Sequence, residues 1–250
     1  MIQAVVFDLY GTLVDVQTNE QALPAYERLA EWLSDRKIRA NPATLAKSFS
    51  DGVDKLKSAL AEPDTEIDVA QVFSLMLQEL GVAKPGPSLV ADLAWSFRKF
   101  TRTRCQPLPG ANDLIQRLRM DYKLGIVANA QKLFTMKELE ELRLVEAFEA
   151  ITLSSNTGFR KPSSKIFEVC LQDLEVSPEE AIFVGDSIEE DIVGAKSVGM
   201  KTLLISSTAQ TGPVEPDGRI KRINEVSRFL EEWQEPLETP LVDEIIDQEE

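Results

Sequence analysis

The sequence contains no histidine and only two cysteines among its 250 residues. The lack of histidine excludes a Ser-His-Asp triad, a Cys-His pair and any histidine-ligated metal site. Catalysis would therefore depend on carboxylates, lysine, hydroxyl groups or a hard metal ion. Cys105 and Cys170 lie far apart and form no CxxC pair, which argues against a disulfide framework or a structural zinc site.

Long hydrophobic runs are also absent. No apolar stretch approaches the roughly 18 residues that span a bilayer, and the start of the chain carries neither a basic region nor a cleavage site. The net charge is −15, but nine acids and no Lys or Arg fall within residues 231–250, and removing these nine leaves −6. Nucleic acids and anionic membranes are therefore unexpected partners. We expect a cytoplasmic protein with an acidic, disordered tail over residues 231–250.

Five short apolar runs predict the strands of a parallel sheet that is buried on both faces. They lie at residues 4–7, 124–128, 150–153, 181–184 and 202–205. Helix-like periodicity separates the later runs, at residues 113–120, 135–144, 163–174 and 188–198. Strands that alternate with helices of this length indicate an α/β fold with a doubly wound, Rossmann-like parallel sheet.

Between the first strand and residue 104 the pattern contains no convincing strand. Four helical segments are predicted instead, at residues 20–33, 42–60, 68–80 and 88–103. We predict that residues 16–104 form a separate helical lid, inserted into a core made of residues 1–15 and 105–230. The stiff turn at residues 106–110 suits a hinge, and the alternative is four helices packed on the sheet edge.

Four basic residues lie at the end of the last predicted lid helix and just after it, namely Arg98, Lys99, Arg102 and Arg104. The simplest expectation for such a group is a solvent-exposed helix face. The alternative is a contact with a phosphate group of a substrate.

Polar residues that can do chemistry follow the predicted strands. Asp8 comes directly after the first strand, Asn129 after the second and Asp186 after the fourth, while Lys161 and Asp191 lie near helix starts. Ligands of open α/β sheets bind at the carboxyl ends of the strands, so these side chains should gather there. Crowded carboxylates repel one another unless a cation bridges them, and oxygen ligands favour Mg²⁺. A lysine beside such an ion suits a phosphoryl group.

These residues also carry a family resemblance. In order and spacing, three motifs over roughly residues 1–205 resemble the haloacid dehalogenase superfamily of hydrolases. The motifs are Asp8-Leu9-Tyr10-Gly11-Thr12-Leu13, Lys161-Pro162 and Gly185-Asp186-Ser187-Ile188-Glu189-Glu190-Asp191. The resemblance implies a three-layered α/β core with an inserted four-helix cap.

The resemblance also implies roles for individual residues. Asp8 would be the nucleophile that forms a covalent aspartyl intermediate, and Lys161 would stabilise negative charge on Asp8 and on the substrate. Asp8, Asp186 and the backbone carbonyl of Tyr10 would hold Mg²⁺, and Asp191 would orient the set. The expected catalytic residues are then Asp8, Lys161, Asn129 and Tyr10, and the expected metal site comprises Asp8, Tyr10, Asp186 and Asp191.

Two positions depart from the family pattern. Tyr10 stands where phosphatases of this family carry an aspartate that protonates the leaving alcohol, and its motif resembles that of the 2-haloacid dehalogenases. Those dehalogenases work without a metal and usually lack the acidic pair that this chain keeps at Asp186 and Asp191. Ala128 stands where the family generally has a serine or threonine in contact with the transferred group.

We therefore predict a Mg²⁺-dependent phosphohydrolase that acts on a small phosphate ester or anhydride. Loss of the leaving-group acid slows such an enzyme by about 10²–10⁴ without abolishing it. The phosphohydrolase should then prefer leaving groups that are stable as anions, such as those of aryl or acyl phosphates. The alternatives are a metal-independent 2-haloacid dehalogenase and a degenerate member that binds a phosphorylated ligand or a protein without turnover.

Overall fold

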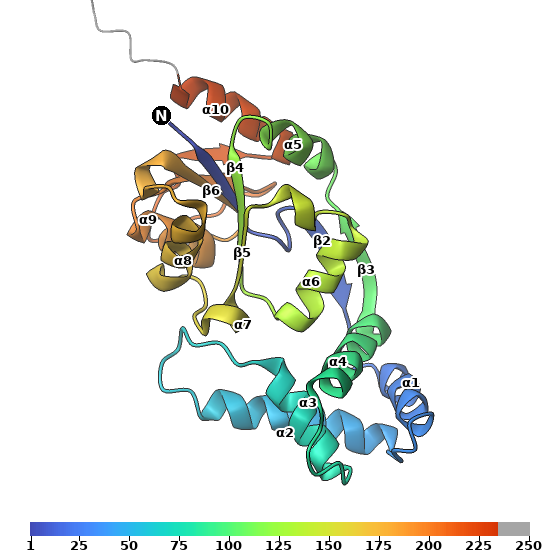
Figure 1. Ribbon diagram of the computed structural model, residues 1–250. Helices are drawn as coiled ribbons and strands as arrows, with labels where there is room; N and C mark the ends of the chain where they lie inside the picture. Colours follow the sequence, from blue (N-terminus) through green and yellow to red (C-terminus); the bar gives the residue numbers. More distant parts are fainter. Residues whose placement is uncertain (235–250) are drawn as a thin grey trace, which may run out of the picture.

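A parallel six-stranded sheet forms one part of the molecule and four helices form the other (Figure 1). The structure is a computed structural model, and it describes residues 1–234. The strand order is β5-β4-β1-β6-β7-β8, and every neighbouring pair in this sheet is parallel. The strands are β1 (Ala4–Phe7), β4 (Lys123–Ala128), β5 (Ala150–Leu153), β6 (Ala181–Gly185), β7 (Lys201–Ile205) and β8 (Gly218–Ile220). The predicted Rossmann-like parallel sheet is confirmed, with the short edge strand β8 as an unpredicted addition.

Helices cover both faces of this sheet. They are α5 (Ala111–Leu118), α6 (Lys132–Glu141), α7 (Ser154–Thr157), α8 (Ser164–Leu174), α9 (Val193–Ser197) and α10 (Val226–Gln234). Val5 and Phe7 of β1 join the hydrophobic cluster beneath α5, α6 and α10, whereas Ala4 and Val6 join the cluster beneath α8 and α9. Because successive side chains of a strand point to opposite faces, a strand covered on both sides must be apolar throughout. This double burial explains the continuous apolar runs in the sequence.

The other four helices pack on one another around their own core. We call α1 (Leu23–Ser34), α2 (Pro42–Ser58), α3 (Val69–Glu79) and α4 (Pro87–Thr101) the four-helix unit. The ring of Phe97 lies 4.5 Å from that of Phe49 and 5.4 Å from that of Phe73. Phe134, at the start of α6, packs against the same cluster and so joins the unit to the α/β part. These four helices lie within a few residues of the segments predicted from periodicity.

Local sequence signals explain where α2 begins. The Asn41 side chain accepts hydrogen bonds from the backbone N–H groups of Ala43, at 2.9 Å, and Thr44, at 3.2 Å. Pro42 occupies the first helical position, where it needs no hydrogen-bond partner for a backbone N–H. Such a cap is worth about 1 kcal/mol.

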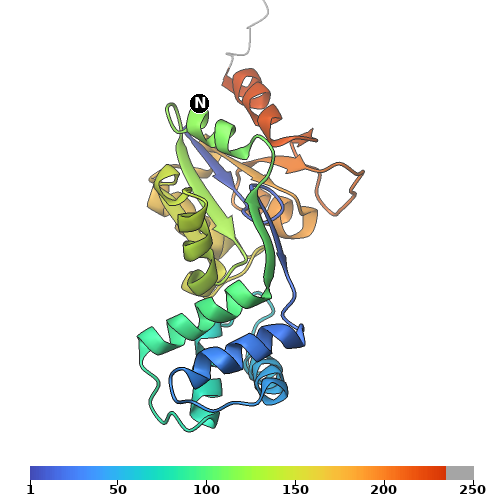
Figure 2. The same cartoon turned by 90° about the vertical axis from the view of Figure 1, so that its right-hand side faces the viewer.

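The prediction that residues 16–104 contain no strand was wrong. Strands β2 (Val14–Thr18) and β3 (Arg102–Pro107) form an antiparallel ribbon, with Val16 opposite Cys105. Figure 2 shows this ribbon as the link between the sheet and the four-helix unit. Most of the ribbon's side chains are at least partly exposed, so it carries no apolar run that marks a strand. Two residues of the predicted hinge at 106–110, Gln106 and Pro107, belong to β3.

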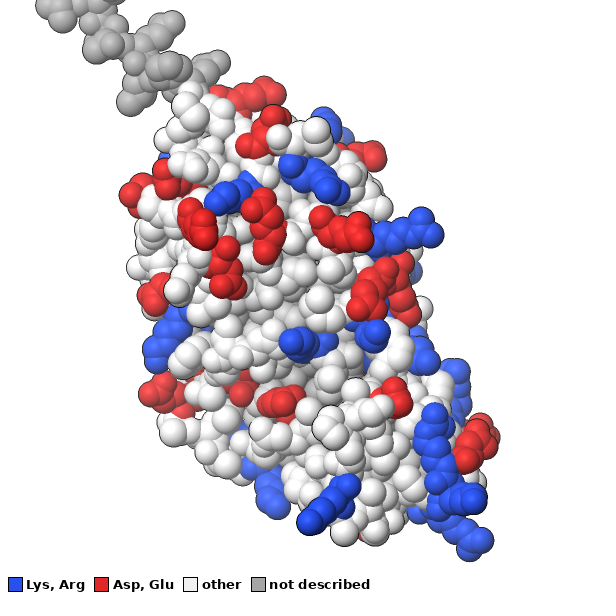
Figure 3. Space-filling model, in the orientation of Figure 1, with Lys and Arg blue, Asp and Glu red and all other residues white. Residues whose placement is uncertain are grey.

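The described chain ends with α10, which continues to Gln234. Residues 231–234 of the expected disordered tail belong to α10, and the rest of that tail, residues 235–250, lies outside the described residues. Within residues 1–234, no helix is both long and apolar enough to cross a membrane. On the face shown in Figure 3, acidic and basic side chains are interspersed over the α/β part.

Candidate functional site

The carboxyl edge of the sheet brings together residues that are far apart in the chain. Asp8 follows β1, Asn129 follows β4 and Asp186 follows β6, and β1 lies between the other two strands. Parallel neighbours end at the same edge, so these three positions converge as the sequence predicted. Lys161, which precedes α8, and Asp191, in the helical turn after β6, complete the group.

Lys161 lies at the centre of the buried polar group. Its Nζ donates to Asp8 Oδ1 at 2.7 Å and to Asp191 Oδ1 at 2.6 Å. The three residues are 3 %, 7 % and 1 % exposed, respectively. Asp8 Oδ2 is buried and has no hydrogen-bond partner among the described residues. An orphaned carboxylate oxygen in such a place is costly unless something outside the protein chain binds it.

Backbone N–H groups bind the carboxylate of Asp191, and the backbone at Gly11 borders that of Asp186. Asp191 Oδ2 accepts hydrogen bonds from the N–H groups of Asp186 and Ser187, both at 3.0 Å. The carboxylate of Asp186 lies against Gly11, where a Cβ atom would come within 2.3 Å of Asp186 Oδ2. Gly11 also has a φ of +98°, which favours glycine. Both the turn and the close approach of Asp186 therefore require glycine at position 11.

The carboxylates of Asp8, Asp186 and Asp191 each offer an oxygen within 4.8 Å of the other two. Burial and the nearby charge of Asp8 raise the pKa of Asp186 from 3.8 to about 6. Burial likewise raises the pKa of Asp191, against the lowering effect of Lys161. Burial lowers the pKa of Lys161, but Asp8 and Asp191 more than offset this, so Lys161 is held in the charged form.

Asn129 holds the backbone of Lys161. Asn129 Oδ1 accepts from the Lys161 N–H at 2.7 Å, and Asn129 Nδ2 donates to the Lys161 carbonyl at 3.2 Å. The amide predicted as a catalytic group therefore lies in the site and positions the lysine. Ala128, the last residue of β4, is buried and brings no hydroxyl to this edge.

The side chain of Tyr10 is bound to α6 instead of to the carboxylate group. Its hydroxyl donates to Glu138 and lies 3.0 Å from the hydroxyl of Thr135. Burial, together with the charge of Glu138, raises the pKa of the Tyr10 phenol above its usual value. The phenol is therefore a poor proton donor to anything other than Glu138.

The expectation that Arg98 lies on a solvent-exposed face was wrong. Arg98 is 7 % exposed and Glu138 only 1 %, and Arg98 Nε donates to Glu138 Oε1 at 2.7 Å. Arg102 is also largely covered, and its Nη2 donates to Glu141 at 2.6 Å. The acidic partners of both arginines lie on α6, about 40 positions along the chain, so the sequence of α4 alone carries no sign of this burial.

A second set of contacts between the four-helix unit and the α/β part was not predicted at all. Ser154 Oγ donates to Glu66 Oε2 at 2.9 Å. Gln131 binds both the carbonyl of Ile67, at 2.9 Å, and the N–H of Val69, at 3.0 Å. These partners are 62 to 88 positions apart, and no local pattern marks them.

The same part of the four-helix unit lies beside the loop that leads to Lys161. The Arg160 N–H donates to the Asp64 carbonyl at 2.7 Å, and the Glu66 N–H donates to the Gly158 carbonyl at 2.9 Å. The loop between α2 and α3 is therefore tied to the segment just before the central lysine.

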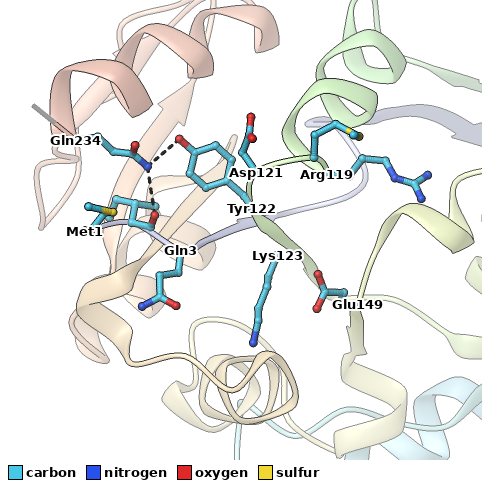
Figure 4. A pocket seen from close by; sticks show the side chains of 10 residues that line it. Met1, Gln3, Arg119, Asp121, Tyr122, Lys123, Glu149 and Gln234 are labelled. Atoms are coloured by element: carbon cyan, nitrogen blue, oxygen red, sulfur yellow. Dashed lines mark hydrogen bonds between the residues drawn. The ribbon is translucent and has the colours of Figure 1, made fainter.

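A surface hollow lies at the opposite, amino-terminal edge of the sheet (Figure 4). Met1 and Gln3 before β1 line it together with Tyr122 and Lys123 at the start of β4, and Gln234 donates to the Tyr122 hydroxyl at 2.9 Å. None of the clustered carboxylates borders this hollow. The clustered carboxylates therefore make the carboxyl edge, and not this hollow, the candidate functional site.

Comparisons with known proteins agree with this arrangement. Residues 2–199 match the family description of a haloacid dehalogenase-like hydrolase. The chain is 33 % identical over 205 residues to a glyceraldehyde 3-phosphate phosphatase of Pyrococcus furiosus, covering 81 % of this chain and 80 % of that protein. A glyceraldehyde 3-phosphate phosphatase of Methanopyrus kandleri is 32 % identical over 209 residues, with 82 % and 84 % covered.

Among solved structures, a 2-haloacid dehalogenase from Pseudomonas syringae pv. Tomato DC3000 is similar with a TM-score of 0.69 and 25 % identity, and the match covers 93 % of this chain and all of that one. The family match extends over most of the chain and includes every residue of the carboxylate group. The chain is an enzyme that belongs to the haloacid dehalogenase-like hydrolases.

Proposed function

We propose that this hydrolase is a Mg²⁺-dependent phosphohydrolase that acts on a small phosphorylated metabolite. The observation that carries the proposal is the buried Oδ2 of Asp8, which lies within a group of three carboxylates and has no hydrogen-bond partner within residues 1–234. Three carboxylates and the single ammonium of Lys161 carry a net charge of −2, which a divalent cation neutralises. The names of the phosphatases similar to this chain support the same class of reaction.

The donor set suits Mg²⁺, because this ion prefers oxygen ligands and is bound through one or two carboxylates. Asp8, Asp186 and the backbone carbonyl of Tyr10 would hold the ion. Asp191 already binds Lys161 and two backbone N–H groups, which supports an orienting role for it. When bound, the ion supplies Lewis-acid polarisation of a phosphoryl oxygen.

Asp8 is the proposed nucleophile. Its carboxylate attacks phosphorus, the bond from phosphorus to the leaving oxygen breaks, and an aspartyl phosphate forms. Water then attacks this phosphorus, which releases inorganic phosphate and restores the Asp8 carboxylate. Lys161 stabilises the negative charge on the phosphoryl group, and Asn129 keeps the lysine in place through its two backbone contacts.

The hydrogen bond from Tyr10 to Glu138 limits the class of substrate that we propose. Its hydroxyl proton is directed at Glu138, so Tyr10 does not replace the missing acid for the leaving group. The enzyme should therefore favour phosphate compounds whose leaving group is stable as an anion.

A 2-haloacid dehalogenase is the second candidate. Tyr10 in the first motif favours it, as does the similarity to the dehalogenase from Pseudomonas syringae. A halide leaves without a proton, and no metal is needed. The clustered carboxylates argue against it, because Lys161 offsets only one of their three negative charges and, without a metal ion, the remaining repulsion would serve no purpose.

One set of assays separates these proposals. Hydrolysis of an aryl phosphate is measured with Mg²⁺ and with EDTA, and chloride release is measured with 2-chloropropionate. We expect phosphate release that needs Mg²⁺ and disappears in Asp8→Asn. Chloride release that persists in EDTA would establish the dehalogenase, and the absence of both products would favour a member that binds its ligand without turnover.

A further inference from the structure

An ionic network centred on the buried pair of Arg98 and Glu138 joins three parts of the chain beside the candidate site. Glu138 of α6 accepts from the Tyr10 hydroxyl, from Arg98 through Nε at 2.7 Å and Nη2 at 3.3 Å, and from Arg102 Nη1 at 3.3 Å. Tyr10 belongs to the loop that contains Asp8, whereas Arg98 belongs to α4 of the four-helix unit. The network therefore connects the first motif to the four-helix unit through a single carboxylate.

Two aromatic rings lie near the guanidinium of Arg98. The guanidinium of Arg98 lies 5.9 Å from the centroid of the Tyr10 ring and 5.2 Å from that of Phe134. A planar guanidinium that binds a carboxylate through two nitrogens has a fixed orientation, unlike the rotating ammonium of a lysine. Movement of α4 relative to α6 is therefore resisted by both the ion pair and the rings.

The Tyr10 end of the network acts on the backbone that carries Asp8. Between Leu9 and Val14 the chain makes a tight turn, with the Gly11 N–H bound to the Val14 carbonyl and the N–H groups of Leu13 and Val14 bound to the Leu9 carbonyl, all at 2.9 Å. In so short a turn, anchoring the Tyr10 ring also fixes the position of the neighbouring backbone.

We propose that Arg98 and Glu138 are positioning residues, which hold the Asp8–Leu13 loop in its productive geometry through Tyr10 and couple that geometry to the placement of the four-helix unit. They touch neither the carboxylate group nor Lys161, so they act only through Tyr10. The inference rests on the proposed function, because the loop that they position carries the proposed nucleophile.

A double-mutant cycle between Arg98→Met and Tyr10→Phe tests the coupling. Arg98→Met removes the contact between Glu138 and α4, and Tyr10→Phe removes the contact between Glu138 and the loop that carries Asp8. In Arg98→Met, Arg102 remains as a cationic partner for Glu138. We expect each single variant to lower kcat by about 10- to 100-fold, the scale of a small misplacement of reacting groups, with a smaller change in KM. The double variant should be no slower than the slower single variant, because the effects are not independent.

Two further variants complete the test. Arg219→Met removes an exposed ion pair with Glu215 at the edge strand β8, at 2.8 Å, and should leave kcat unchanged. Arg98→Lys should have a higher kcat than Arg98→Met, because it restores the positive charge, but a lower kcat than the unaltered enzyme, because a lysine cannot bind Glu138 through two nitrogens. Multiplicative effects in the double variant, or single variants with unchanged kcat, would overturn the proposal.

Hydrogen exchange gives a readout that does not need activity. Exchange of the Gly11, Leu13 and Val14 amides should accelerate in Arg98→Met and Tyr10→Phe alike, and not in Arg219→Met. If the unaltered enzyme hydrolyses no phosphate ester, the proposed function fails. The exchange rates of these amides then still show whether Arg98 and Tyr10 hold the loop. If the unaltered enzyme is active but the Arg98→Met amides exchange at the parental rate, the positioning role alone fails.

Discussion

Replacing Asp8 by asparagine should abolish activity while barely changing the stability of the metal-free protein. The change removes an attraction to Lys161 Nζ at 2.7 Å and two repulsions from carboxylates whose oxygens lie within 4.8 Å. With an effective dielectric constant of about 20, the attraction amounts to about 6 kcal/mol and each repulsion to at least about 3.5 kcal/mol. The opposing contributions nearly cancel, so the free energy of unfolding should change by no more than about 2 kcal/mol.

Mg²⁺ should raise the thermal stability of the unaltered enzyme more than that of Asp8→Asn. A ligand at about 100 times its dissociation constant stabilises a folded protein by about 2.7 kcal/mol, and for a chain of this size 1 kcal/mol corresponds to about 2–4 °C in Tm. We therefore expect Mg²⁺ to raise the Tm of the unaltered enzyme by about 5–10 °C and that of Asp8→Asn by much less. Hydrolysis by Asp8→Asn should fall by at least about 10⁴-fold.

Thermal melts in EDTA and over a Mg²⁺ titration provide the assay. Glu149→Gln is the matched control, because it also removes one carboxylate charge but from an exposed position at the opposite edge of the sheet. An Asp8→Asn protein that melts about 15 °C below the parent in EDTA, or that gains as much from Mg²⁺ as the parent does, would refute the electrostatic reasoning.

Three further outcomes follow from the same geometry. Gly11→Ala places a Cβ atom 2.3 Å from Asp186 Oδ2, so the Mg²⁺ concentration for half-maximal activity should rise by about 10- to 100-fold, and an unchanged value would contradict the proposed role of Asp186. The pKa of Asp186 is raised from 3.8 to about 6, so its folded form binds a proton more tightly than the unfolded chain does. Melts in EDTA should therefore show stability falling as the pH rises from 3.8 to about 6, and saturating Mg²⁺ should reduce that loss. Across a series of phosphate esters, kcat/KM should fall steeply as the pKa of the leaving group rises, because Tyr10 is bound to Glu138, and a flat series with chemistry limiting would count against this.

The sequence predicts the sheet well because double burial leaves a direct trace in it. Strand β1 begins and ends where its apolar run does, since both of its faces are covered. The ribbon of β2 and β3 leaves no such trace, because its side chains alternate among buried, half-buried and exposed environments with no apolar run. Burial on one side of a short ribbon is too weak a signal to compete with the helical periodicity on either side.

Some residues of the candidate site could be predicted from the sequence and others could not. Asp8, Asn129 and Asp186 were predictable because they follow strands whose ends must meet. Arg98 and Glu138 were not, because a charged residue on an amphipathic helix appears solvent-exposed until its partner on another element is known. The polar residues that join the four-helix unit to the α/β part depend on long-range docking, and local sequence patterns do not encode it.

The antiparallel ribbon has a consequence for how this protein can evolve. Because β2 and β3 are paired, the chain leaves the α/β part and returns to it at neighbouring points about 5 Å apart. An insertion with such closely spaced ends can be lengthened, shortened or exchanged for another without disturbing the register of the sheet. Recombination at the ribbon would therefore exchange the four-helix unit while keeping Asp8, Lys161 and the other carboxylates, and full activity should return only where the incoming unit again supplies a partner for Glu138 in the place of Arg98.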